Sequence, residues 1–168
     1  MKKINFYIIL TILTISLSAC GYKLRGSLDT GNLSEVSILY DTRHEVVDLM
    51  INNLESNQIR INLNVESYPM IRVMNLESSK RQLSVNSSGR ADEYEITLKL
   101  DYIFKLSETD VISGSLSGSA SYDFNESQMQ GTKEQEIIAL NSIHTNLTRK
   151  IINKFIRVIK KAQSEIGE

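Results

Sequence analysis

Cysteine and histidine are scarce in this chain of 168 residues, which has one cysteine, two histidines and no tryptophan. A single thiol, Cys20, excludes an internal disulfide and a metal site built from several cysteines. The histidines, His44 and His144, show no spacing typical of metal ligands or of a catalytic base. We therefore predict no metal site, and we interpret His144 as a half-buried packing residue.

Common catalytic motifs are also missing. The chain has no glycine-rich phosphate loop, and the segment from Gly114 to Gly118 has Leu116 where a nucleophile elbow needs serine. Its acidic residues are scattered, and no two of them are marked as an acid and base pair. We therefore predict a protein that is not an enzyme, with no catalytic residues and no bound cofactor.

Basic charge is not in excess. Residues 20–168 contain 17 Lys and Arg against 20 Asp and Glu, a formal charge of −3. This balance argues against a bulk electrostatic nucleic-acid binder, although it leaves room for a local basic patch.

The first 19 residues have the pattern of a lipoprotein signal peptide. Two lysines precede an apolar stretch from Ile4 to Leu17, which is shorter than the roughly 20 residues of a membrane span. Cys20 directly follows Leu17, Ser18 and Ala19, where a thiol can receive diacylglycerol before cleavage. The alternative is an ordinary secretory signal with an incidental cysteine.

Cys20 is therefore expected to carry covalent acyl and diacylglycerol lipid that holds the protein on a membrane. Gly21 follows it, whereas lipoproteins kept in the inner membrane commonly have Asp there, so the periplasmic side of the outer membrane is the favoured location. Removal of residues 1–19 leaves 149 residues, which fit a single domain. We predict a lipid-proximal connector over 20–34 and a folded body over 35–168.

Hydrophobic periodicity predicts both helices and strands in that body. A helix is expected over 42–56, with Thr42 and Glu45 as a capping box and Asn57 as a left-handed terminator. A long helix is expected after a second capping box, Thr132 with Gln135, with Ile137 on its apolar face. Apolar and polar residues alternate in the segments expected to be extended, which are 36–40, 59–65, 70–85, 94–106 and 112–124.

The expected fold class is α+β, a two-layer sandwich in which a mostly antiparallel four-stranded sheet packs against two helices. The sequence leaves the roles of two surface features undecided. The serine row Ser113, Ser115, Ser117, Ser119 and Ser121 is either a solvated strand face or a face that another strand, a barrel wall or a lipid headgroup approaches closely. The basic run from Lys150 to Lys161 is interpreted as a solvated helix face near the helix C-terminus.

The order of several short motifs resembles that of the LPS-assembly lipoprotein family LptE. These motifs are residues 20–26 after the signal, 89–94 opening the long strand, and 124–129 with 133–135 before the last helix. Tyr22 stands where the family often has Trp. The resemblance implies a lipoprotein that plugs the lumen of the outer-membrane barrel LptD, assists assembly of that barrel and takes part in lipopolysaccharide delivery.

The resemblance also implies basic residues that contact lipopolysaccharide. Lys133 matches one such position. A second position, in the turn before the strand at Gly89, is Ser87 here, so nearby Arg90 or Arg81 is the expected substitute. The rival hypothesis is a stand-alone periplasmic lipoprotein that binds an apolar ligand between sheet and helices, and a weaker one is a lipid-anchored hydrolase.

Overall fold

The computed structural model describes residues 33–166, so the signal peptide, Cys20 and most of the predicted connector lie outside the described residues. No helix within 33–166 combines the length and the apolar character needed to cross a membrane. The described elements are β1 (Glu35–Tyr40), α2 (Glu45–Ser56), β2 (Arg60–Leu63), β3 (Met70–Val85), β4 (Ala91–Lys105), β5 (Val111–Asp123), the 3-10 turn η1 (Glu126–Gln128) and α3 (Met129–Ile166).

The strands form one mixed sheet in the order β2-β1-β3-β4-β5. The two longest pairings, β3 with β4 and β4 with β5, are antiparallel. β1 runs parallel to both of its neighbours, and α2 carries the chain back between β1 and β2. The predicted α+β sandwich of a sheet on two helices is confirmed, with five strands rather than four because Arg60–Leu63 pairs with β1.

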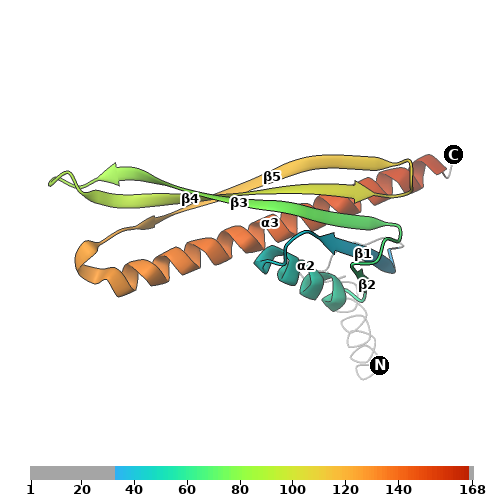
Figure 1. The fold of residues 1–168 in the computed structure, drawn as a ribbon, viewed down its shortest axis with the longest axis horizontal. Helices are drawn as coiled ribbons and strands as arrows, with labels where there is room; N and C mark the ends of the chain where they lie inside the picture. The colour runs from blue at the N-terminus through green and yellow to red at the C-terminus, as the bar shows by residue number, and fades with distance from the viewer. Residues whose placement is uncertain (1–32, 167–168) are drawn as a thin grey trace, which may run out of the picture.

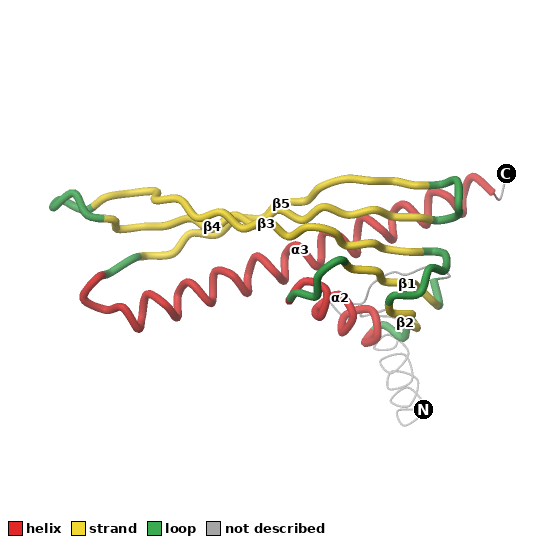
Figure 2. The backbone as a smooth tube through the Cα atoms, viewed as in Figure 1, coloured by secondary structure: helices red, strands yellow, loops and turns green. Residues whose placement is uncertain are grey.

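The molecule is long and narrow, with two distinct ends (Figures 1 and 2). We call the end with the β3–β4 turn and the β5–α3 connection the tip, and the end with the β4–β5 turn and the last turns of α3 the base. α3 runs from the tip to the base along the sheet, while α2 and β1 lie in the half of the molecule nearer the base (Figure 1).

One continuous core joins the sheet to both helices. The even positions of β4 from Ile96 to Phe104 are buried, as their strict alternation predicts. α3 faces them with buried residues that begin at Ala139 and include Leu147 and Phe155. The prediction that Ile137 lies on the apolar face of the last helix was wrong, because this residue is 49% exposed. The face of α3 that packs on the sheet is rotated away from Ile137 and contains Ala139, Leu147 and Phe155.

The ends of the helices also differ from the sequence prediction. His44, not Thr42, is the N-cap of α2, and no side chain caps that helix. Asn57 is the C-cap but has a φ of −96°, and the left-handed residue is Gln58. Before the last helix, Asn125 caps the 3-10 turn η1, and its side chain accepts a hydrogen bond from the Ser127 backbone. Thr132 lies inside α3, which begins at Met129, so both predicted capping boxes were wrong.

The glycines of β5 allow neighbouring groups to come close to the strand. A Cβ at Gly114 would lie 2.5 Å from the Tyr102 hydroxyl, and one at Gly118 would lie 3.1 Å from the Ile143 side chain on α3. Larger residues here would displace Tyr102 or lift α3 from the sheet. The serines of β5 alternate with these positions and are exposed on the opposite face.

A pair of half-buried histidines predicts an acid-sensitive contact between α2 and α3. Burial lowers the pKa of both His44 and His144, and proximity to His144 lowers the pKa of His44 further. Both ring nitrogens of His44 and Nδ1 of His144 are buried without a hydrogen-bond partner among residues 33–166. Because these pKa values fall below the ordinary value of about 6.5, the unfolded chain takes up protons first.

The contribution of the two histidines to stability is therefore complete above about pH 6.5 and is lost as the pH falls through their lowered values. Urea unfolding at about pH 7.5 and about pH 5 measures this loss. The variant His44→Gln/His144→Gln should lose less stability over that interval than the natural protein. An equal loss in both proteins would assign the acid sensitivity to carboxylates.

Candidate functional site: the tip of the sandwich

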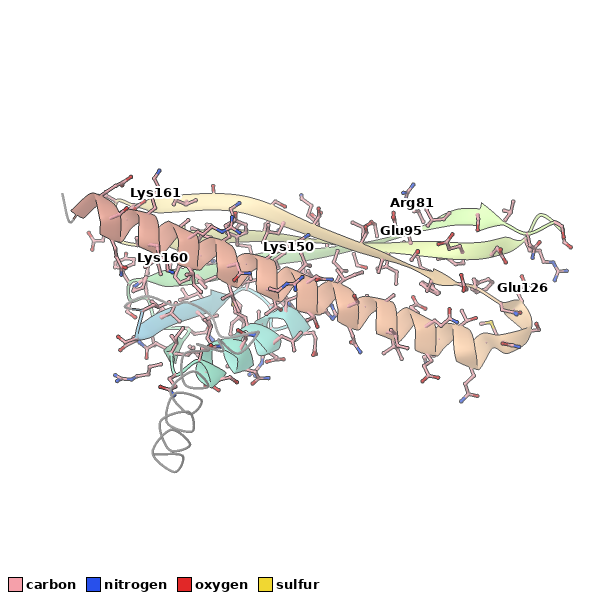
Figure 3. The ribbon with its side chains drawn as sticks, turned by 180° about the vertical axis from the view of Figure 1, so that it is seen from behind. Arg81, Glu95, Glu126, Lys150, Lys160 and Lys161 are labelled. Carbon is pink, nitrogen blue, oxygen red and sulfur yellow. The ribbon has the colours of Figure 1, made fainter. Side chains whose placement is uncertain are left out.

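The predicted ligand-binding residues Arg81, Arg90 and Lys133 come from three elements that meet at the tip. Arg81 lies near the end of β3, Arg90 in the β3–β4 turn and Lys133 in the second turn of α3. Figure 3 shows Arg81 near the tip on the sheet face away from α3, and Glu126 beside the β5–α3 connection. The structure thus brings the three positions to one end of the molecule, on different faces of it.

Arg81 is already paired within the sheet. Its Nε donates to Glu95 Oε2 at 2.7 Å, and the two residues are register partners on β3 and β4. The Arg81 side chain is 71% exposed, so this pair contributes little to stability and its guanidinium can turn to another acceptor.

Arg90 lies beside an open groove at the end of the sheet. The Asn86 side chain accepts hydrogen bonds from the backbone N–H groups of Ser88 and Arg90, which fixes the turn. Arg90 Nη1 donates across the groove to Glu126 Oε2 at 2.8 Å. The groove, of about 780 Å³, is lined by Asn86, Arg90, Ala91, Asp92, Asp123, Phe124, Asn125, Glu126 and Ser127. An anion entering it has to replace Glu126 on Arg90.

Lys133 is the unpaired cation among the three. It is exposed, and within residues 33–166 no acidic group or hydrogen-bond acceptor holds its ammonium.

A second lysine of the tip, Lys80, is not among the residues predicted from the sequence. Its Nζ lies 3.0 Å from Glu136 Oε1 and 4.8 Å and 5.0 Å from the ring centres of Tyr94 and Tyr122, so it is held between sheet and helix.

The tip combines scattered charge with exposed apolar side chains. Residues 80–95 contain three basic and three acidic residues, and residues 123–136 contain one basic and four acidic, so the tip has a formal charge of −3. Any contact with an anion there depends on individual cations rather than on a basic field. The exposed apolar side chains of the tip are Leu83, Val85, Met129, Ile137 and Ile138.

The excess of positive charge lies in the other half of α3. Residues 137–164 contain six basic residues and no acidic one. Lys150, Lys154, Arg157 and Lys161 recur at i, i+4, i+7 and i+11, which places them on one side of the helix. Lys150 Nζ donates to the Ser117 backbone carbonyl of β5 at 2.9 Å, so this side borders β5. The basic run is evident in the sequence, and helical spacing alone predicts that these four residues share one side of the helix.

No cluster of three or more His, Cys, Asp or Glu side chains that could hold a metal ion occurs among the described residues.

The family model described as LptE, lipopolysaccharide-assembly, matches residues 31–155. A search of curated proteins gave no significant match. Among solved structures, the rare lipoprotein B of Shewanella oneidensis is similar over 80% of this chain and 99% of its own, with 13% identity and a TM-score of 0.66.

A lipoprotein B of Nitrosomonas europaea is similar over 83% of this chain and 93% of its own, with 17% identity and a TM-score of 0.64. A minor lipoprotein of Acinetobacter baumannii is similar over 74% and 92%, with 13% identity and a TM-score of 0.54. At these identities the structural matches establish a shared fold, and the family match covers most of the described residues.

Proposed function

The chain belongs to the LptE family of lipopolysaccharide-assembly proteins, and from this we propose that it is a non-catalytic, lipid-anchored plug of an LptD-like outer-membrane barrel. In this proposal Cys20 carries the anchor on the periplasmic side of the outer membrane. The protein assists assembly of the barrel and takes part in lipopolysaccharide delivery to the outer leaflet. The family match over residues 31–155 is the single observation that carries the proposal.

The dimensions of the molecule support a plug. α3 has 38 residues, which at about 1.5 Å per residue extend over roughly 57 Å. The hydrocarbon core of a bilayer is about 30 Å thick, so a sandwich of this length can pass through a barrel and still reach the periplasm. The lumen of a large barrel is polar, and the outer face of β5 offers serine side chains to such a wall.

The tip suits contact with lipopolysaccharide, which combines phosphate groups with acyl chains. Lys133 offers an unpaired ammonium that acts as a point charge on a phosphate or carboxylate. Met129 and Ile137 expose apolar side chains on the same stretch of α3, 60% and 49% exposed. Arg90 and Arg81 can contribute only by releasing Glu126 and Glu95.

The packing of the core weighs against the rival hypothesis of an apolar ligand between sheet and helices. Phe104, Leu147 and Phe155 are all fully buried at that interface, and the two phenylalanine rings meet edge to face at 5.1 Å. A ligand between the layers would have to displace these side chains.

Depletion of the protein in its parent bacterium tests the proposed function. The amount of folded barrel in the outer membrane should fall, and newly made lipopolysaccharide should remain accessible from the periplasm rather than reach the surface. Surface labelling of lipopolysaccharide and immunoblotting of the barrel measure both effects. Normal surface lipopolysaccharide after complete depletion would contradict the proposal.

Charge reversal at Lys133 provides a sharper test of the tip. Lys133→Glu should weaken lipopolysaccharide binding by about tenfold, because it replaces an attraction with a repulsion of similar size. The thermal midpoint should change little, because Lys133 is exposed and holds no acidic partner among residues 33–166. Binding is measured with purified protein and lipopolysaccharide in solution.

Arg149→Glu is the matched control for Lys133→Glu, because it reverses an exposed charge on the same helix away from the tip. It should leave binding unchanged. Equal binding by Lys133→Glu and the natural protein would remove Lys133 from the site.

A further inference from the structure

The free edge of β5 is long and nearly unprotected. β5 is the last strand of the sheet order and spans 13 residues, with no charge and no proline before Asp123. Native proteins commonly protect such edges with charge, proline, bulges or a covering element, because open edges pair with other strands. The pairing of β5 with β4 has no bulge, so the edge is regular along its whole length.

The hydrogen bonds at the ends of β5 show which of its backbone groups point outward. The Phe124 backbone N–H donates to the Asp92 carbonyl of β4, whereas the Asp123 N–H donates outward to Gln135 Oε1. The Ser117 carbonyl also points outward, to Lys150. Because the two directions alternate along an antiparallel strand, the odd-numbered residues of β5 present their N–H and C=O groups at the edge.

These outward groups belong to the serine row. The Ser117 carbonyl accepts from Lys150. Within residues 33–166, no protein group pairs with the other outward N–H and C=O groups of the serine row. The serine side chains are small and exposed, and Gly118 between them has no side chain. A second strand can therefore approach closely and form a new antiparallel or parallel pairing.

The basic side of α3 runs along the same edge. We call Lys150, Lys154, Arg157 and Lys161 the cationic stripe; all four side chains are exposed. Figure 3 shows Lys150 and Lys161 where α3 borders β5. A strand added to β5 would place every second side chain on the helix side of the sheet, beside this stripe.

We propose that the open edge of β5 and the cationic stripe together bind an extended, acidic strand of a partner protein. Backbone hydrogen bonds to the serine row hold the strand, and carboxylates at alternate positions pair with the stripe. Lys150 then leaves the Ser117 carbonyl, which accepts from the incoming strand. That this partner is the barrel rests on the proposed function. The location of the binding surface and the acidic character of the strand do not depend on the proposed function.

Charge selects this occupant over a second copy of the chain. Pairing of two β5 edges about a two-fold axis would bring two cationic stripes toward each other, and like charges in contact repel. A membrane surface also attracts cations, but it forms no strand pairing with the edge amides of β5.

A synthetic peptide tests the proposal without knowledge of the partner. The probe is a fluorescein-labelled peptide of about 12 alternating Thr and Glu residues, long enough to span β5 at about 3.3 Å per residue. It is titrated into the purified full-length protein in mild detergent, and fluorescence anisotropy reports binding. An alternating Thr and Lys peptide is the charge control and should not bind.

Two protein variants separate the backbone from the charge. Ser119→Pro removes an outward N–H without removing a hydrogen bond to β4, so the sheet can keep its fold. Lys154→Glu/Arg157→Glu reverses two charges of the stripe. Each should weaken binding of the Thr and Glu peptide by at least about tenfold. Two matched controls should bind the peptide as the natural protein does. Ser119→Ala keeps the backbone N–H, and Arg149→Glu reverses a charge outside the stripe.

Failure to bind the acidic peptide, equal binding of both peptides, or equal binding by Ser119→Pro and Ser119→Ala would overturn the proposal. Binding to phosphatidylglycerol vesicles is the alternative outcome. If the vesicles bind through the stripe, Ser119→Pro has no effect on that binding and no peptide binds, the stripe is a membrane contact instead. Co-purification of a barrel without peptide binding leaves the proposed function standing and rejects this inference. Peptide binding without a barrel does the reverse.

Discussion

Phe155→Ala is expected to lower the free energy of unfolding by about 3–5 kcal/mol, the usual cost of removing a buried aromatic ring. Phe155 is fully buried in α3, and its ring meets Phe104 edge to face at 5.1 Å. Phe104 stacks in turn on Tyr102, with ring centres 4.4 Å apart. The ring therefore joins the helix to the base end of β4, and its loss leaves a cavity that the stacked pair cannot fill.

Urea unfolding followed by circular dichroism measures this loss. Ile138→Ala is the matched control, because Ile138 is an apolar residue of the same helix but is 62% exposed. Its effect should stay within about 0.5 kcal/mol. A similar small effect of Phe155→Ala would contradict the described packing of α3 on the sheet.

Replacement of residues 1–20 with an ordinary cleavable secretory signal, in cells without the partner barrel, is expected to move the protein from the membrane fraction to the soluble periplasm. Lipid chains contribute about 0.8 kcal/mol per buried CH₂, and two chains are enough for a stable anchor. Loss of all chains therefore lowers membrane partitioning by many orders of magnitude. The signal is exchanged as a whole because Cys20 also marks the cleavage site.

Cell fractionation and mass spectrometry of the N-terminal residue measure this prediction. Exchange of the signal for that of another lipoprotein, with Cys20 retained, is the control and should keep the protein membrane-bound. Membrane retention without Cys20 and without a barrel partner would show that lipid is not the anchor.

The sequence predicts the elements with strictly periodic patterns and misses their distant pairings. β4 is predicted within a few residues because one face of the strand is buried from Ile96 to Phe104, which imposes a period of two. The parallel pairing of β1 with β3 joins residues 37–40 to 70–73, and nothing local in either segment specifies it. The predicted helix starts are wrong because Thr42 and Thr132 match a cap pattern, whereas α2 begins after His44 and α3 begins at Met129.

The sequence names the candidate residues but does not predict what surrounds them. Resemblance to the family places Lys133 and Arg90, and the structure locates both at the tip. The partner of Arg90 is Glu126, 36 residues away, which only the fold can reveal. The cationic stripe is visible in helical spacing, but its border with an open strand edge requires the strand order.

Co-purification from native membranes tests whether the protein is the plug of an outer-membrane barrel. The tagged, lipidated protein is extracted in mild detergent, and its stable partners are identified and counted by native mass spectrometry. We expect one copy of a large outer-membrane barrel bound to each copy of this protein. Recovery of the lipidated protein without any barrel would contradict the proposed function and favour a stand-alone periplasmic binding lipoprotein.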